Sequence, residues 1–162
     1  MEEIRRESVL KKYSSYAELS GEDLSLLKEA KEAVHTSYAP YSKFHVGCAL
    51  LLQNGKIVKG SNQENIAYPS GLCAERVAIF HAGATYPDVP VVAMAITVKA
   101  EHFEVNEPIM SCGACLQSIS EYELKFNQPI RIILQGETGP VMIAEGLRTF
   151  MPFMFWLDEL RS

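Results

Sequence analysis

The sequence lacks the usual features of membrane and nucleic-acid-binding proteins. None of its apolar runs reaches the roughly 18 to 20 residues that a membrane-crossing helix needs. It has no basic cluster, and its 15 lysines and arginines are outnumbered by 20 acidic residues, for a net charge of −5. The first residues, Met-Glu-Glu-Ile-Arg-Arg, do not resemble a secretion signal. We therefore expect a cytoplasmic protein with a small-molecule substrate and no nucleic acid or membrane partner.

Cysteine is also scarce, with four residues in the whole chain. Without a secretion signal, disulfides are poor candidates, because the cytosol keeps thiols reduced. Cys48 lies within an apolar run, and we expect it to pack in the core. The other three cysteines stand in two short motifs, Cys73-Ala74-Glu75 and Cys112-Gly113-Ala114-Cys115, and are candidate metal ligands.

The length of 162 residues and a hydrophobic content of 48% are sufficient for one well-buried core. We expect a single domain over residues 20–162. Residues 1–19 have mixed charge and weak periodicity, and form an N-terminal extension that is either an extra helix or a mobile arm.

Hydrophobic periodicity and turn residues predict the order of helices and strands. Helices are expected from Ser20 to before Pro40, where Ser20 and Asp23 resemble a capping box, and over 73–84, 112–125 and 144–149. Strands are expected over 44–52, 56–58 (after the turn Asn54-Gly55), 91–98, 130–134 and 141–143. This order predicts the α/β class, as a three-layer α/β/α sandwich in which helices cover both faces of a mixed sheet.

Three of the cysteines predict an open zinc site. If both motifs begin helices, the thiolates of Cys73, Cys112 and Cys115 lie at or beside helix N-termini, where free N–H groups stabilise anions. Structural zinc sites have four protein ligands, whereas catalytic sites have three and leave one position to water or substrate. Glu75, two residues from a ligand, is then placed to move a proton of that water.

Three thiolates around Zn²⁺ leave a formal charge of −1, which weakens the ability of the metal to acidify water. Arg76 directly follows Glu75. A guanidinium that donates to a ligand sulfur would withdraw charge from it, and we expect Arg76 to have this role.

Four motifs resemble, in the same order, those of the small homo-oligomeric cytidine deaminases. They are Tyr38–Gly47, Gly60–Asn65, Tyr68–Arg76 and Ser111–Cys115, and the resemblance extends from about Tyr38 to Leu160. Deoxycytidylate, free-base and nucleic-acid deaminases typically have histidine at the position of Cys73. The chain is therefore similar to the nucleoside branch of these enzymes.

The resemblance implies hydrolytic deamination of cytidine and deoxycytidine to uridine and deoxyuridine, with release of ammonia, in pyrimidine salvage. It implies one Zn²⁺ per subunit on Cys73, Cys112 and Cys115, attack of activated water on C4 of cytosine, and proton transfer by Glu75. The implied assembly is a homo-oligomer, with a tetramer favoured and a dimer as the alternative.

The resemblance also implies six substrate-binding residues. Asn62 and Glu64 bind the ribose hydroxyls, which favours a nucleoside over a nucleotide because a carboxylate repels phosphate. The others are Phe44 beside the substrate, the backbone N–H of Ala74 at the base carbonyl, and, from a neighbouring subunit, Tyr68 and Phe155.

The chain departs from the family pattern at three positions. Ser111 stands where proline usually precedes the Cys-x-x-Cys motif, Leu116 replaces an arginine, and His45 stands where proline is frequent. None of these changes removes a metal ligand or Glu75.

Three alternatives remain at the level of the sequence. The apolar tail Phe150–Leu157 leaves open a related substrate such as blasticidin S. A non-catalytic zinc-binding module would need a fourth protein ligand from Cys48 or a histidine. A dithiol redox protein would use Cys112 and Cys115, and would leave Cys73 and Glu75 without a role.

Overall fold

The centre of the fold is a mixed six-stranded sheet, seen in a computed structural model that describes residues 1–157. The strand order is β1-β6-β5-β4-β2-β3, and β4 and β5 are parallel while the other neighbours are antiparallel. The strands are β1 (Lys11–Tyr13), β2 (Phe44–Leu52), β3 (Ile57–Ser61), β4 (Val91–Ala100), β5 (Arg131–Gln135) and β6 (Val141–Glu145). The end of the family resemblance, residues 158–160, lies outside the described residues.

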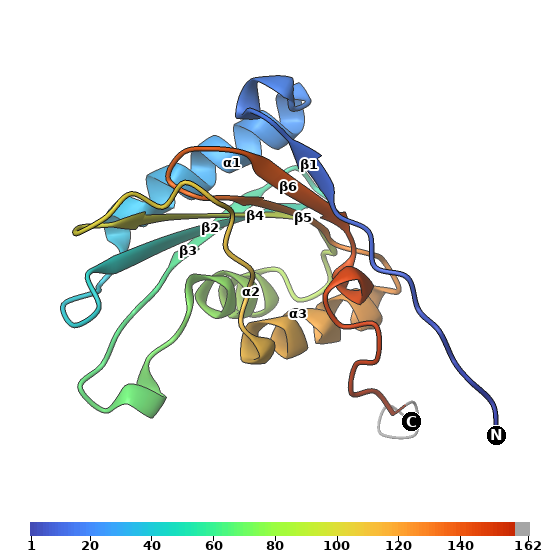
Figure 1. Cartoon of the computed structure of the whole chain (residues 1–162). Helices are drawn as coiled ribbons and strands as arrows, with labels where there is room; N and C mark the ends of the chain where they lie inside the picture. The colour runs from blue at the N-terminus through green and yellow to red at the C-terminus, as the bar shows by residue number, and fades with distance from the viewer. Residues whose placement is uncertain (158–162) are drawn as a thin grey trace.

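Helices cover both faces of this sheet, as Figure 1 shows. One face carries α1 (Gly21–Ala33), and the other carries α2 (Ala74–Thr85) and α3 (Gly113–Phe126) side by side. Four short 3-10 helices connect these elements: Tyr16–Glu18, Val34–Thr36, Tyr68–Ser70 and Leu147–Thr149. The predicted three-layer α/β/α sandwich is confirmed.

Alternating residues of the strands divide the core into two layers. Ala49 faces the α1 layer with Leu27 and Ile133, whereas Cys48 and Ile79 belong to the layer under α2 and α3. Cys48 has no exposed surface, which confirms that it packs in the core. In the described part of the chain, no helix is long and apolar enough to cross a membrane.

Local signals placed most of the elements correctly. The strand predicted over 44–52 has these bounds, and it pairs with β3 across the Asn54-Gly55 turn, where Gly55 has a φ of 79°. Ser20 caps α1, since its Oγ accepts from the backbone N of Asp23 at 3.2 Å. The Asp23 carboxylate, expected to complete a capping box, instead accepts from Arg131 Nη2 at 2.7 Å.

The helix predicted over 144–149 is wrong. Ala144 and Glu145 continue β6 and pair with β5, and Gly146, with a φ of 109°, ends the strand. Only the short 3-10 turn Leu147–Thr149 follows. Pairing with a neighbouring strand therefore outweighs the local helical tendency of this segment.

The N-terminal segment contains a strand that neither sequence alternative included. Its residues Lys11–Tyr13 form β1, which pairs with β6 in antiparallel register from Lys11↔Ile143 to Tyr13↔Val141. Lys11 also forms an ion pair with Glu145 at 3.1 Å. Part of the extension thus belongs to the sheet.

Gly60 lets the first turn of α2 lie directly on β3, so we predict that Gly60→Ala disturbs the helix that carries Glu75. A Cβ at this position would come within 2.5 Å of Ala78 N and 2.7 Å of Ala74 O, which are backbone atoms that cannot rotate away. We expect a loss of about 1 to 3 kcal/mol in the free energy of unfolding, measured by urea denaturation. Gly21→Ala is the control, because a Cβ there meets nothing within 4 Å. Equal stability of the two variants would contradict the prediction.

Candidate active site

The structure brings three of the four cysteines together at the N-termini of two helices. Cys73 precedes α2 as its N-cap residue, Cys112 is the N-cap of α3, and Cys115 lies in the first turn of α3. The Sγ atoms of Cys73 and Cys112 are 4.0 Å apart, and those of Cys112 and Cys115 are 3.4 Å apart. All three sulfurs lie within 4.8 Å of one another, and none forms a disulfide.

The helix ends explain why thiolates are favoured here. Neither α2 nor α3 has a side-chain hydrogen bond that caps its N-terminus. The free N–H groups and the positive end of each helix dipole therefore face the sulfurs. Because α2 and α3 lie side by side on the same face of the sheet, the two helix ends act on one cluster (Figure 1).

Neighbouring groups already stabilise one thiolate. A hydrogen bond with Cys115, together with the Arg76 guanidinium, holds the pKa of Cys73 at about 5, well below its ordinary value. The same contact with Cys73, together with burial, raises the pKa of Cys115. A dication between the sulfurs favours release of the remaining thiol protons, because metal ligands must be deprotonated. The donor set fits zinc, which binds thiolate sulfur readily.

The cluster offers three protein ligands. Within residues 1–157, no further His, Cys, Asp or Glu ligand atom belongs to the group, so neither Cys48 nor Glu75 is part of it. A tetrahedral zinc ion held here would keep one position for water or substrate. This observation weighs against the non-catalytic zinc module, which needs a fourth protein ligand.

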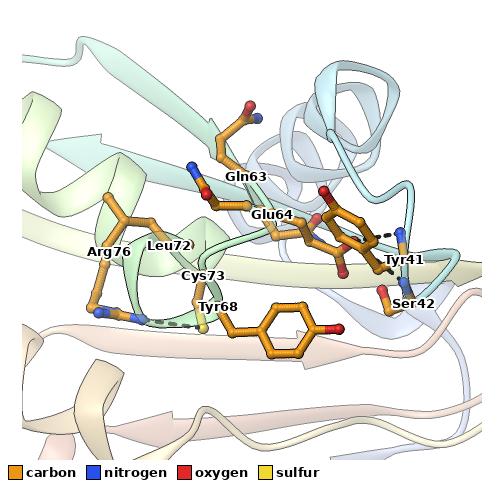
Figure 2. A pocket seen from close by; sticks show the side chains of 11 residues that line it. Tyr41, Ser42, Gln63, Glu64, Tyr68, Leu72, Cys73 and Arg76 are labelled. Carbon is orange, nitrogen blue, oxygen red and sulfur yellow. Dashed lines mark hydrogen bonds between the residues drawn. The ribbon is translucent and has the colours of Figure 1, made fainter.

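Arg76 contacts the cluster as its position predicts. Its Nη2 donates to Cys73 Sγ at 3.7 Å, the contact drawn as a dashed line in Figure 2. This hydrogen bond is also the main reason why the pKa of Arg76 is raised. The guanidinium is thus placed to withdraw charge from a ligand sulfur.

Glu75 lies beside the cluster in the first turn of α2 and is 5% exposed. Burial raises its pKa, and the charge of Cys73 adds to this effect. Ser111 lies close enough to lower that pKa in part, although its buried hydroxyl does not reach the geometry of a regular hydrogen bond. A buried carboxyl with a raised pKa holds a proton more readily than an exposed one, as a group that accepts and delivers protons requires.

A cavity of about 580 Å³ opens next to Cys73 and Arg76 (Figure 2). Its volume is in the range of pockets that bind small molecules. Its lining includes three residues that the resemblance assigned to the substrate, namely Asn62, Glu64 and Tyr68. The lining residues that sequence analysis did not single out are Tyr41, Ser42, Gln63, Asn65, Gly71 and Leu72. All six belong to the motifs Tyr38–Gly47, Gly60–Asn65 and Tyr68–Arg76, which was the signal that could have identified them.

Asn62 and Glu64 are held rigidly and keep free polar atoms. The Asn62 side chain donates one amide hydrogen to Phe44 O at 2.8 Å, which leaves its second amide hydrogen for a ligand. Glu64 Oε2 accepts from Tyr41 N at 2.9 Å and from Ser42 N at 3.3 Å. Desolvation is the largest single influence on the pKa of Glu64 and raises it, but the hydrogen bonds from Ser42 and Tyr41 together outweigh it and hold that pKa below its ordinary value.

Three of the six assigned substrate residues, Phe44, Ala74 and Phe155, are not among the residues that line the cavity of their own chain. The Phe44 ring stacks on Phe103, with 6.4 Å between ring centroids. Phe155 is 72% exposed, and its carbonyl accepts from Gln117 Nε2 at 3.5 Å. Tyr68 lines the cavity but is itself 76% exposed and contacts Tyr41 edge to face, with 6.1 Å between centroids. Local sequence could not place these rings, because their positions depend on loops and on the tail.

Ala74 lies between Cys73 and Glu75 as the first residue of α2 and is fully buried. Its backbone N–H belongs to the first turn, where N–H groups have no partner within the helix. That N–H is therefore free to donate to a group bound next to the cysteines.

Comparison with known proteins agrees with this arrangement. The family model described as "Cytidine and deoxycytidylate deaminase zinc-binding region" matches residues 20–126. A cytidine deaminase from Halalkalibacterium halodurans is 37% identical over 137 residues, which cover 85% of this chain and 96% of the relative. One from Sporosarcina psychrophila is 43% identical over 136 residues, or 83% and 92% of the two chains.

A solved structure shows the same fold. The crystal structure of cytidine deaminase from Burkholderia pseudomallei superposes with a TM-score of 0.71 at 34% identity, and the match covers 85% of this chain and all of the other. The family match includes all three clustered cysteines, and the resemblance seen in the four motifs is confirmed. The chain belongs to the cytidine and deoxycytidylate deaminase family.

Proposed function

We propose that this protein is a zinc-dependent enzyme that hydrolyses cytidine and deoxycytidine to uridine and deoxyuridine, with release of ammonia. The observation that carries the proposal is a cluster of three thiols with a buried carboxyl, Glu75, next to a cavity of nucleoside size. The relatives named cytidine deaminase support it over most of the chain. Pyrimidine salvage in the cytoplasm is the proposed setting, and four free cysteines are compatible with a reducing compartment.

In this proposal, Cys73, Cys112 and Cys115 hold one zinc ion per subunit, and Arg76 reduces the charge on Cys73. Zinc would supply Lewis acidity that makes a water molecule nucleophilic near neutral pH. Glu75 accepts a proton from the attacking water and delivers it to N3 of the base. Glu75 then takes the second proton from the hydroxyl group added at C4 and delivers it to the amino group, so that the C4–N bond breaks, ammonia departs and C4 becomes a carbonyl. The Ala74 N–H donates to the base carbonyl.

The two residues proposed to bind the ribose, Asn62 and Glu64, favour a nucleoside over a nucleotide as the substrate. Glu64 is ionised by its hydrogen bonds, and it accepts from a ribose hydroxyl through Oε1, the oxygen that its backbone donors do not use. The free amide hydrogen of Asn62 donates to a neighbouring hydroxyl. A phosphate beside the Glu64 carboxylate would be repelled.

A substrate panel tests the proposal. We expect the absorbance change that accompanies deamination with both cytidine and deoxycytidine. With cytidine monophosphate, kcat/KM should be at least about 100-fold lower, because contact between the phosphate and the Glu64 carboxylate would cost several kcal/mol. Blasticidin S completes the panel. Turnover of blasticidin S alone would replace the proposed substrate, and no turnover of any member by zinc-loaded protein would contradict the reaction.

We also propose that the enzyme is a homo-oligomer, with a tetramer favoured. Tyr68 and Phe155 are more than two-thirds exposed, and Phe153 is 67% exposed. Exposed aromatic side chains of this size become buried where a partner subunit covers them. Tyr68 and Phe155 are therefore proposed to reach the substrate of a neighbouring subunit, and Phe44 to approach it within its own chain. Light scattering that finds a monomer at assay concentration would overturn this assembly.

A further inference from the structure

His45 connects a carboxylate to Asn62 through a continuous chain of hydrogen bonds. Glu101 Oε1 lies 3.1 Å from His45 Nε2, and His45 Nδ1 lies 3.1 Å from Ser37 Oγ. Ser37 Oγ is 2.6 Å from Asn62 Oδ1. We call this chain of contacts, Glu101–His45–Ser37–Asn62, the relay.

Asn62 fixes which atom donates in each hydrogen bond of the relay. The side-chain amide is clamped by the backbone of β2, since Val46 N donates to Oδ1 at 2.7 Å and Nδ2 donates to Phe44 O at 2.8 Å. The amide cannot turn over without losing both bonds. Because Oδ1 has no hydrogen, Ser37 must donate its only hydroxyl hydrogen to Asn62.

The remaining links then require two protons on His45. The Ser37 hydrogen is used, so Ser37 Oγ can only accept, and His45 Nδ1 must carry the hydrogen between them. The other ring nitrogen faces the Glu101 carboxylate, which accepts when ionised, so Nε2 must also carry a hydrogen. Only the imidazolium form of histidine has both N–H groups.

Neutral His45 breaks the relay at one of two places. With the hydrogen on Nδ1, the Nε2 lone pair faces the Glu101 carboxylate. With the hydrogen on Nε2, Ser37 turns its hydroxyl to His45 and leaves two oxygen lone pairs opposed across the 2.6 Å contact with Asn62. Because the ionised Glu101 carboxylate can only accept, it favours the second arrangement, which displaces Asn62 or Ser37.

Several charges face the relay. The His45 side chain is 22% exposed. The carboxylates of Glu101 and Glu64 interact favourably with a positive charge on its ring. Lys99 is its cross-strand partner on β4 and forms a long ion pair with Glu137 at 3.8 Å. Lys43 and His102 act on Glu101. The hydrogen bond from His45 is the main cause that lowers the pKa of Glu101, as expected for an ion pair.

We propose that His45 is a positioning residue, whose imidazolium form holds Asn62 through Ser37 in the orientation that binds the sugar of the substrate. The inference rests on the proposed function in one respect, the contact of Asn62 with a nucleoside. As pH rises and His45 loses its proton, KM for cytidine rises by about three- to tenfold, the factor that one net hydrogen bond is worth. The kcat stays unchanged, because His45 does not touch the reacting atoms.

The proton state is tested without any assay of activity. The two ring nitrogens of His45 are followed by nitrogen-15 NMR in zinc-loaded enzyme from about pH 5.5 to about pH 8.5, the range in which histidines titrate. We expect the signature of two N–H groups on His45 at the lower end of this range. A neutral His45 throughout this range would overturn the proposal.

Kinetics test the link to Asn62. In the wild type, KM rises with pH as His45 deprotonates, whereas in Ser37→Ala the ring nitrogens of His45 still change with pH and the change in KM disappears. His45→Gln also removes the change in KM. His81→Gln, an exposed histidine on α2, is the control that keeps it. Zinc content and thermal unfolding establish that each variant is folded.

The outcomes separate the two proposals. A wild-type KM that is independent of pH while His45 titrates would overturn the relay. Absence of any turnover by the wild type would contradict the proposed function instead, and the NMR titration would still decide the proton state of His45.

Discussion

Glu75→Gln is expected to lower kcat for cytidine by about 10²- to 10⁴-fold, the contribution typical of a general acid–base group. Glutamine has nearly the shape of glutamate but cannot carry a proton between water and base. The carboxyl is buried beside the cysteines and does not belong to the ligand group. Zinc content, measured by mass spectrometry, should therefore stay at one ion per chain, and the thermal midpoint should change little.

The control for this variant is Glu123→Gln. Glu123 is a half-buried glutamate whose pKa is also raised, chiefly by burial, but it lies near the C-terminal end of α3, whereas Cys112 and Cys115 lie at the N-terminal end. Its Oε1 accepts from Ile130 N and Leu147 N, and a glutamine oxygen can accept the same bonds. We expect nearly normal turnover in this variant. If Glu75→Gln retained turnover like the control, Glu75 would have no part in proton transfer.

Cys73→Ser is expected to remove both zinc and activity. Changes to groups that merely orient metal ligands cost 10- to 100-fold in affinity, so loss of a ligand sulfur should cost more than about 100-fold. Metal analysis after gel filtration measures the loss. The variant should also unfold at a lower temperature than wild type, because a metal that binds the folded chain stabilises it.

Cys48→Ala is the matched control, because Cys48 is a fully buried cysteine outside the cluster. It should keep one zinc ion per chain and lose about 1 kcal/mol of stability, the typical effect of a point mutation. Retention of zinc by Cys73→Ser would contradict the three-sulfur site and favour the dithiol reading of Cys112 and Cys115. Loss of zinc from Cys48→Ala would indicate a fourth ligand.

Local sequence was sufficient where the physical cause of an element is local. The strand Phe44–Leu52 is an apolar run ended by the Asn54-Gly55 turn, and Cys73 and Cys112 stand at helix starts. The Arg76 contact with Cys73 was also accessible, since residues three apart at a helix start lie on the same side.

Features set by distant pairing were not accessible. The strand β1 contains two lysines and forms because it pairs with β6, about 130 residues later in the chain. The end of β6 has a local helical tendency at Ala144, and it is a strand because Ala144 and Glu145 pair with Ile132 and Arg131 of β5, a register that the local sequence does not give. Neither outcome follows from periodicity within the segment.

The functional site also combines residues of short local motifs with residues that only the fold brings together. The cysteines and Glu75 stand in short motifs, but the relay through His45 joins residues that only the fold brings together. Glu101 reaches His45 because Phe44 pairs with Ala100 in the β2–β4 register. Sequence alone marked His45 as a departure from the family pattern and gave it no role.

The most direct test of the central claim is a zinc titration of the metal-free protein, with uridine formation from cytidine as the readout. A zinc-dependent deaminase with one site per chain predicts a rate that rises in proportion to added zinc and reaches its plateau at one equivalent. A rate that does not depend on zinc, or a protein that binds one equivalent and forms no uridine, would contradict the claim.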